Sequence, residues 1–136
     1  MSKVERVDEL VANLPTDLSV IEGLRRALQT ISHEFEDSKD LQFARARLVE
    51  STPSLQTLVL QHEAKWVESF ADAVAARLGL DPDEDLRPEL TAAVVVAAFR
   101  AVMNRWIRSG GTADIDQMLD QALVFLGSGL GSSDFD

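Results

Sequence analysis

The chain has 136 residues, a formal net charge of -10, 46% hydrophobic residues and no cysteine. This length suits one domain with a substantial core rather than two domains of ordinary size. An acidic chain without a local run of Lys or Arg makes a poor surface for nucleic acid, and the lack of cysteine excludes disulfides and Cys-based metal sites. The first residues lack the apolar core of a signal peptide, so the expected compartment is the cytoplasm.

Hydrophobic residues recur with a helical period in six segments, and strand-like alternation of any length does not occur, so we expect an all-α fold. The first segment, residues 4–14, ends before Pro15 because the residue preceding a proline is pushed out of the helical region. The second segment follows Ser19, which has capping-box spacing with Glu22.

The third predicted helix covers about residues 41–50, and the fourth and longest covers residues 53–78. Pro53 suits the first turn of that long helix, and Gly79 suits its C-terminal cap. The pattern of the third helix places three residues on its inner face: Leu41, Ala44 and Leu48.

The fifth predicted helix, residues 86–109, contains eight consecutive apolar residues, from Ala92 to Phe99. It does not read as a membrane span, because a bilayer requires roughly twenty apolar residues and Arg100, Arg105 and Arg108 interrupt the pattern. The helix has two apolar faces, which need two sets of neighbours. Its own domain can supply one set, and a partner subunit can supply the other.

The sixth predicted helix starts at Asp114, which can cap it together with Gln117. Residues 128–136 have the composition of a flexible tail, which leaves residues 1–127 as the domain.

Residues 44–111 resemble the C-terminal domain of one branch of the TetR family of bacterial transcriptional regulators, the branch that includes mycofactocin-type regulators. The likeness rests on RARLVESTPSL, the spacing from there to Trp66, the turn GLDPDEDLRP, and an RWIRSGG ending before an Asp-rich last helix. It extends more weakly over residues 6–126. No single motif is diagnostic, but their order and spacing are hard to obtain by chance.

The resemblance implies a six-helix bundle that encloses an effector pocket, with the last two long helices pairing with their symmetry mates in a four-helix dimer interface. It also implies a helix-turn-helix module for operator DNA at the N-terminal side. We find no basic recognition helix before Val4, so we expect no direct nucleic-acid binding by this chain, and DNA binding only through such a module in an intact regulator.

The implied pocket is expected to lie beside the fourth helix, where His62 falls in the middle of an apolar face. A buried imidazole needs a hydrogen-bond partner, which an effector or a neighbouring protein group can provide. Trp66 and Phe70 can be core residues or a ligand platform. Arg47 can meet a carboxylate or phosphate of the effector, or it can project into water or pair with an acidic side chain. The full set of candidate ligand-binding residues is Phe35, Phe43, Arg47, His62, Trp66, Phe70, Met103 and Trp106.

For the dimer, we expect small and branched residues that allow two helices to approach closely. The alternative is that residues 86–109 form the central helix of a monomeric bundle, buried by its own domain. The candidate interface residues are Leu90, Val94, Ala97, Ala101, Met118, Ala122 and Phe125.

Enzymatic chemistry has little support in the sequence. His33 and His62 lie at unrelated helix positions, and the chain contains no HExxH, no Glu-x-x-His pair and no glycine-rich phosphate loop. We expect no catalytic residues, no metal, no cofactor and no membrane association.

The favoured function is an effector-binding and dimerisation domain of a transcriptional regulator, with a homodimer and a small apolar or amphipathic effector as partners. The alternative is a stand-alone helical module that heterodimerises with an intact regulator.

Overall fold

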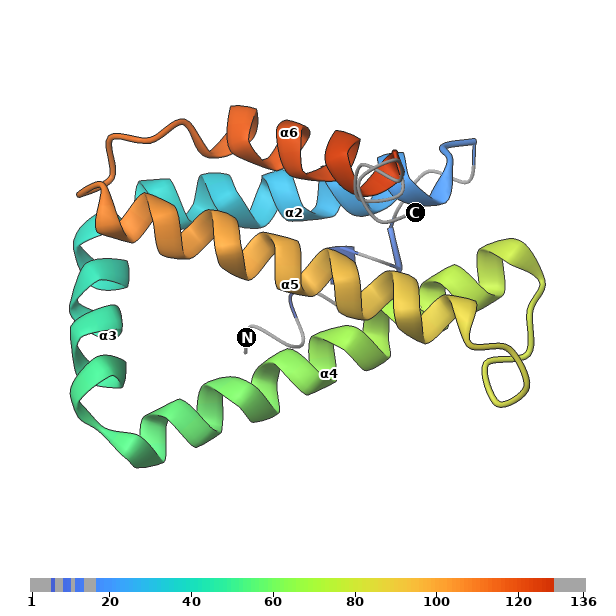
Figure 1. Cartoon of the computed structure of the whole chain (residues 1–136), viewed down its shortest axis with the longest axis horizontal. Helices are drawn as coiled ribbons and strands as arrows, with labels where there is room; N and C mark the ends of the chain where they lie inside the picture. The colour runs from blue at the N-terminus through green and yellow to red at the C-terminus, as the bar shows by residue number, and fades with distance from the viewer. Residues whose placement is uncertain (1–5, 7–8, 11, 14–16, 129–136) are drawn as a thin grey trace, which may run out of the picture.

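The computed structural model describes residues 6, 9, 10, 12, 13 and 17–128. Within these residues the chain forms five α-helices and no strand, which confirms the all-α prediction (Figure 1). The predicted first helix, residues 4–14, lies mainly outside the described residues, so a sixth helix stays a prediction. Residues 129–136 of the predicted tail also lie outside them. The helices are α2 (Val20–Asp37), α3 (Lys39–Ser51), α4 (Pro53–Leu78), α5 (Arg87–Arg108) and α6 (Ile115–Gly127).

The predicted helix starts after Ser19 and Asp114 are confirmed by their caps. The Ser19 hydroxyl accepts a hydrogen bond from the Glu22 backbone N–H at 3.2 Å, and this bond satisfies one of the free amides in the first turn of α2. The Asp114 carboxylate accepts in the same way from the Gln117 N–H at 3.0 Å at the start of α6. Both helices then bury one apolar stripe against α5 and each other.

The bounds predicted for α4 agree with the structure at both ends. Pro53 occupies the first turn, where its missing N–H costs no helical hydrogen bond. Gly79 adopts a left-handed conformation with φ of 65°, which glycine tolerates better than any residue with a Cβ atom. A turn over residues 79–86 then reverses the chain into α5, so that α4 and α5 meet at this end (Figure 1).

The inner face predicted for α3 is wrong. Leu41 and Leu48 are 51% and 57% exposed, whereas Gln42 is buried and the ring of Phe43 packs on Trp106. The reason is the placement of α3, which crosses the end of the bundle between α2 and α4 instead of lying along its core (Figure 1). Only the part of α3 that faces α2, α4 and the end of α5 is covered, so its apolar stripe does not decide which side is buried.

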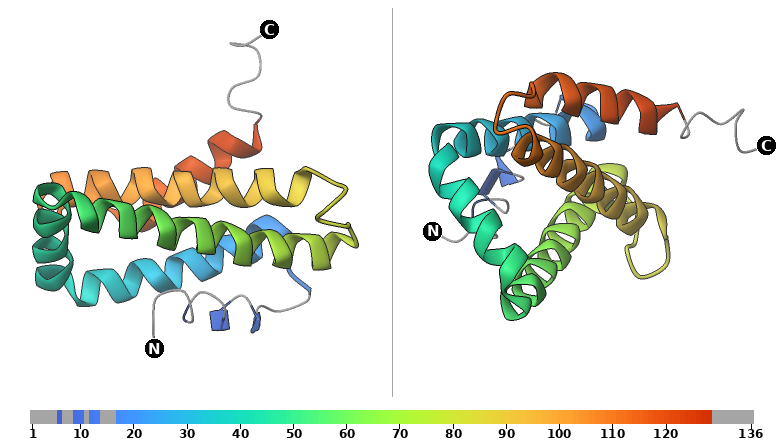
Figure 2. Two further views of the ribbon diagram at one scale, coloured as in Figure 1. Left: turned by 90° about the horizontal axis from the view of Figure 1, so that it is seen from below. Right: turned by 60° about the vertical axis from the view of Figure 1, so that its left-hand side comes forward.

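Helix α5 runs through the middle of the fold, with α4 on one side and α2 and α6 on another (Figure 2). By length and mean hydropathy, 1.4 over its most apolar stretch, α5 would qualify to cross a membrane. Core helices of soluble proteins meet the same test. Part of the apolar character has an internal explanation, because eight residues of α5 are buried against neighbouring helices.

Helix α6 is shorter than the resemblance implied. It has 13 residues, as many as α3, against 22 in α5, so the prediction of two long final helices is wrong for the second. Two ion pairs attach α6 to α2. Arg25 Nη1 lies 2.7 Å from Asp120 Oδ1, and His33 Nε2 lies 2.9 Å from Asp116 Oδ2. The His33 side chain is exposed, and its partner lies on another helix.

Candidate functional site

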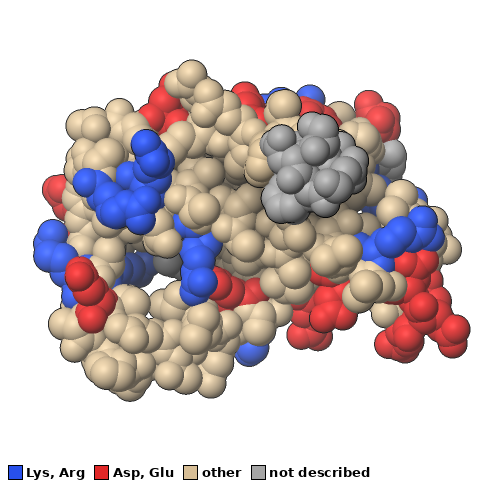
Figure 3. Space-filling model, in the orientation of Figure 1, with Lys and Arg blue, Asp and Glu red and all other residues tan. Residues whose placement is uncertain are grey.

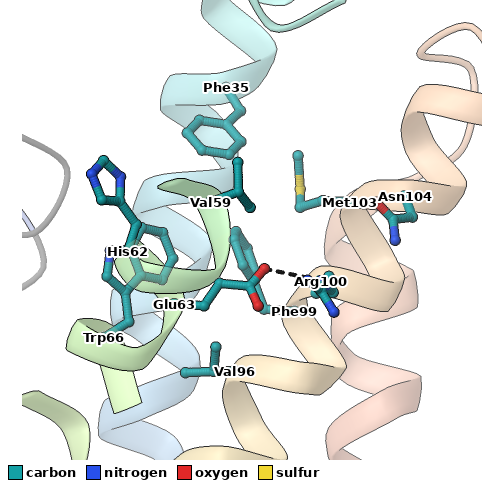
Figure 4. Close-up of a pocket in the computed structure, with 10 residues that line it drawn as sticks. All are labelled: Phe35, Val59, His62, Glu63, Trp66, Val96, Phe99, Arg100, Met103 and Asn104. Atoms are coloured by element: carbon teal, nitrogen blue, oxygen red, sulfur yellow. Dashed lines mark ion pairs between the residues drawn. The ribbon is translucent and has the colours of Figure 1, made fainter. Parts of the chain in front are cut away.

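Helices α2, α4 and α5 enclose a cavity of about 220 Å³ (Figure 4). The cavity exists because α4 diverges from α5 towards the α3 end of the molecule (Figure 1). Among residues 53–65 of α4 none is buried, whereas Trp66 and Phe70 further along the helix are. The lining residues are Phe35, Val59, His62, Glu63, Trp66, Val96, Phe99, Arg100, Met103 and Asn104.

Aromatic rings form one part of the cavity wall. The ring of Phe99 lies between two others, with its centroid 6.0 Å from Trp66 and 6.3 Å from Phe35. Rings at these separations attract one another in tilted arrangements, which fixes the shape of the wall. Val59, Val96 and Met103 add aliphatic and thioether surface, so most of the lining is apolar.

An ion pair forms the polar part of the wall. Glu63 Oε1 of α4 lies 2.9 Å from Arg100 Nε of α5, so the pair joins the two helices beside the cavity (Figure 4). The Glu63 side chain is 28% exposed and that of Arg100 is 45% exposed, which places the pair where the cavity meets solvent. His62 is half-buried and Asn104 is exposed, and both offer hydrogen-bonding atoms at the lining.

The structure brings four of the eight candidate ligand-binding residues to this cavity: Phe35, His62, Trp66 and Met103. The other four lie elsewhere. Phe70 and Trp106 are completely buried in the core, and Phe43 covers Trp106 with ring centroids 5.3 Å apart. Arg47 is exposed on α3. A ligand role for these four stays a prediction without support from the cavity lining.

Six further residues line the cavity without having been among the candidates. The helical spacing of apolar residues could have predicted some of these six. Val59 and Phe99 lie on the apolar faces already recognised on their helices. Glu63 and Arg100 carry the usual signal of a solvated face, and nothing in the local pattern shows that they meet across two helices. The six are Val59, Glu63, Val96, Phe99, Arg100 and Asn104.

A shallow groove between α5 and α6 lies on the other side of α5. Six of the seven candidate dimer residues line it: Val94, Ala97, Ala101, Met118, Ala122 and Phe125. The seventh, Leu90, lines an adjoining hollow together with Ile21 of α2. Leu90 and Phe125 are each 53% exposed and Val124 is 74% exposed, while Ala97 and Ala101 are also exposed. The described part of the chain therefore leaves one apolar face of α5 uncovered.

Charge is distributed unevenly around these two sites. In the view of Figure 3, neutral side chains cover the middle of the face over α5, and acidic side chains gather at the turn between α4 and α5. In that turn a hydrogen bond from Arg87 lowers the pKa of Asp85 to about 2. On α2, the hydrogen bond to Asp116 raises the pKa of His33. Within the described ranges, no group of three or more His, Asp or Glu side chains is placed to hold a metal ion.

Comparison with known proteins identifies the family. Residues 18–131 match the TetR-family domain described as the MftR C-terminal domain. A stretch of 66 residues, 48% of this chain, is 39% identical to the HTH-type transcriptional regulator TcmR of Streptomyces glaucescens and spans 29% of that protein's length. Both matches indicate a regulator rather than an enzyme. The family match covers most of the chain, including all five described helices, and the chain therefore belongs to the TetR family of transcriptional regulators, as a C-terminal domain of the MftR type.

Proposed function

We propose that this chain is the effector-binding and dimerisation domain of a TetR-family transcriptional regulator. The observation that carries the proposal is the position of α5, which borders a partly enclosed apolar cavity on one side and presents an uncovered apolar face on the other. A regulator needs both features, because a small molecule must be sensed and two DNA-reading modules must be held together.

The cavity supports binding of a small apolar or amphipathic effector. Ligand sites are concave and mostly apolar, with a few polar groups that orient the molecule. Phe35, Trp66 and Phe99 supply the apolar wall, while Glu63, Arg100 and Asn104 supply the polar groups. This hollow combines aromatic side chains from three helices with a charged pair at its edge.

The groove supports a two-fold symmetric homodimer. Ala97 and Ala101 leave room for a second helix to approach closely, and Met118 and Phe125 provide larger apolar surface beside them. In a two-fold interface the same patch serves both subunits, so α5, α6 and their mates would form four packed helices. An apolar face of this kind is rarely left in water by a monomer.

DNA would be bound by a helix-turn-helix module of the intact regulator in the cytoplasm. The relative TcmR is named as a helix-turn-helix regulator, and the matched stretch covers only part of it. The formal charge of -10 on the present 136 residues disfavours direct contact with phosphates. In this proposal the effector changes the geometry of the dimer, and that change reaches the DNA-reading modules.

A thermal-shift screen of metabolites, combined with sedimentation equilibrium, tests the proposal. An effector at one hundred times its dissociation constant should stabilise the chain by about 2.7 kcal/mol. The variant Val59→Phe, which fills the cavity, should lose this response, whereas Leu60→Phe on the exposed side of α4 should keep it. The parent should sediment as a dimer at tens of micromolar. A monomer that no compound stabilises would contradict the proposal, and a monomer that instead forms a complex with an intact regulator would favour the heterodimerising module.

A further inference from the structure

The charged groups of the cavity are already paired with each other. The lining contains one carboxylate, Glu63, and one guanidinium, Arg100, and their atoms Oε1 and Nε are 2.9 Å apart. The two charges cancel at the lining. Neither one is left uncompensated in the way that a site built for an ionic ligand leaves its counter-charge.

The transfer of an ion from water into this cavity should therefore be unfavourable in free energy. The ion would give up part of its hydration to the apolar wall formed by Phe35, Trp66 and Phe99, and the charge of Arg100 or Glu63 that it would meet is already compensated by the partner in the pair. An uncharged molecule with a hydroxyl or carbonyl group does not meet this cost. It can share the remaining hydrogen-bonding atoms of the pair or use the amide of Asn104 while the pair stays intact.

The size of the cavity limits the ligand further. An engineered protein cavity of about 150 Å³ holds one benzene ring. The present cavity of about 220 Å³ is moderately larger and is open to solvent at the side of the ion pair, so it suits a skeleton of about two fused rings. The aromatic side chains around Phe99 favour a flat skeleton.

We infer that the effector is an uncharged, flat, aromatic molecule of about two rings with a hydroxyl or carbonyl group, and that the Glu63–Arg100 pair excludes ionic analogues. This inference rests on the proposed function, because it assumes that the cavity is the effector site. The pair determines specificity because its two charges cancel and leave no counter-charge for an ionic ligand. Removing either partner leaves the other as an unpaired charge and should invert the selectivity.

Isothermal titration calorimetry with four probes of one shape tests the inference: naphthalene, 2-naphthol, 2-naphthoate and 2-naphthylmethylammonium. The parent chain should bind 2-naphthol most tightly, with each ion weaker by roughly tenfold or more, because an ion must be desolvated without a free counter-charge. Naphthalene should bind more weakly than 2-naphthol, since it lacks the polar group. The variant Val59→Phe should abolish binding of all four and so assign it to the cavity.

Two single-charge variants then separate a specificity role from a structural one. Glu63→Gln frees Arg100, so 2-naphthoate should gain roughly tenfold in affinity while 2-naphthylmethylammonium loses affinity. Arg100→Gln frees Glu63 and should produce the opposite change. Glu68→Gln on α4 and Arg108→Gln on α5 change the net charge equally at exposed positions away from the lining, and they should leave the order of the parent unchanged.

A general loss of structure would weaken all probes together, so opposite shifts in the two variants support the inference. The inference that the effector is uncharged would be overturned if the parent bound either ion as tightly as 2-naphthol. It would also be overturned if both variants kept the parent's order of probe affinities. Either result would leave the cavity as an effector site. A parent that binds none of the probes would also overturn the inference. The metabolite screen and the sedimentation experiment decide the proposed function separately.

Discussion

The two sides of α5 are both apolar but differ in what covers them. On the inner side, Val95, Phe99, Val102 and Trp106 are almost completely buried by α2, α4 and α6. On the outer side, Leu90, Ala97 and Ala101 remain exposed to solvent. Both sides of α5 carry Val and Ala, and both aromatic residues of the helix, Phe99 and Trp106, lie on the inner side, where neighbouring helices cover them.

This contrast shows that an apolar helix face predicts burial without identifying the surface that buries it. The inner side obtains its cover from residues distant in the sequence but within the same chain. The outer side would obtain cover from a second copy of the chain, as proposed above. Substitutions on the two sides should accordingly affect different measurements, namely the free energy of unfolding for the inner side and the association equilibrium for the outer side.

The largest effect is expected for Trp106→Ala on the inner side. Trp106 is completely buried, and removing a buried aromatic ring costs about 3–5 kcal/mol through lost burial and the cavity left behind. Urea denaturation followed by circular dichroism should show this loss. Leu60→Ala, an apolar truncation at an exposed position of α4, should change the free energy of unfolding by less than about 0.5 kcal/mol. Similar losses in the two variants would mean that the inner side is not close-packed.

The next effect concerns the outer side, where Ala97→Glu or Ala101→Glu should dissociate the dimer. Each substitution acts twice in a two-fold interface and places like charges near the symmetry axis. An uncompensated buried charge costs about 3 kcal/mol, which corresponds to at least roughly a hundredfold weaker association. Sedimentation equilibrium measures the dimer association constant, and Ala64→Glu at an exposed position of α4 is the control. A monomeric parent, or equal effects at all three positions, would remove the distinction between the two sides.

A smaller effect is expected at the connection that places α6 beside the outer side. Gly110 and Gly111 have φ values of 67° and 80°, so an alanine at either position should cost about 1–2 kcal/mol of strain. A Cβ atom at Gly111 would also lie 2.8 Å from Lys39 Cε, whereas one at Gly110 would meet no atom within 4 Å. The midpoint temperature of thermal unfolding should therefore be lower for Gly111→Ala than for Gly110→Ala. The difference should be small, because the lysine side chain can move. The reverse order would contradict this account of the connection.

The smallest effect is expected from the contact between His33 of α2 and Asp116 of α6. The hydrogen bond raises the pKa of His33 in the folded chain. Its stabilisation is therefore fully present below the unfolded histidine pKa of about 6.5 and is lost as pH rises through the higher folded value. Both side chains are exposed, so the urea midpoint should decrease only slightly across this window. His33→Gln should lack that decrease, and a parent whose midpoint increased with pH across the window would show that the pair is not stabilising.

Local signals predicted the helices well. Pro53 and Gly79 gave both bounds of α4, and the side chains of Ser19 and Asp114 marked two starts, because caps and glycine conformations depend on residues close in sequence. The buried side of α3 could not be predicted in this way. It depends on where α2 and α5 end in space, and those positions follow from the packing of the whole bundle.

The candidate site was predicted in part for the same reason. His62 and Trp66 could be placed on one face of α4 from their spacing, and both line the cavity. The pairing of Glu63 with Arg100 could not be predicted, because each residue alone has the pattern of a solvated surface. Contacts between helices that are far apart in the sequence require the crossing geometry of those helices.

The positions of the two tryptophans give the protein a built-in optical readout. The chain contains no tyrosine, so its near-ultraviolet emission comes from Trp66 and Trp106. Trp66 lies in the cavity wall and Trp106 in the core, and within the described residues both indole N–H groups are buried without a hydrogen-bond partner. Both fluorophores should therefore emit at short wavelength in the folded state and shift to the red on unfolding. In Trp106→Phe the remaining emission arises at the cavity alone, so a ligand-induced change in that variant would report occupancy without an added label.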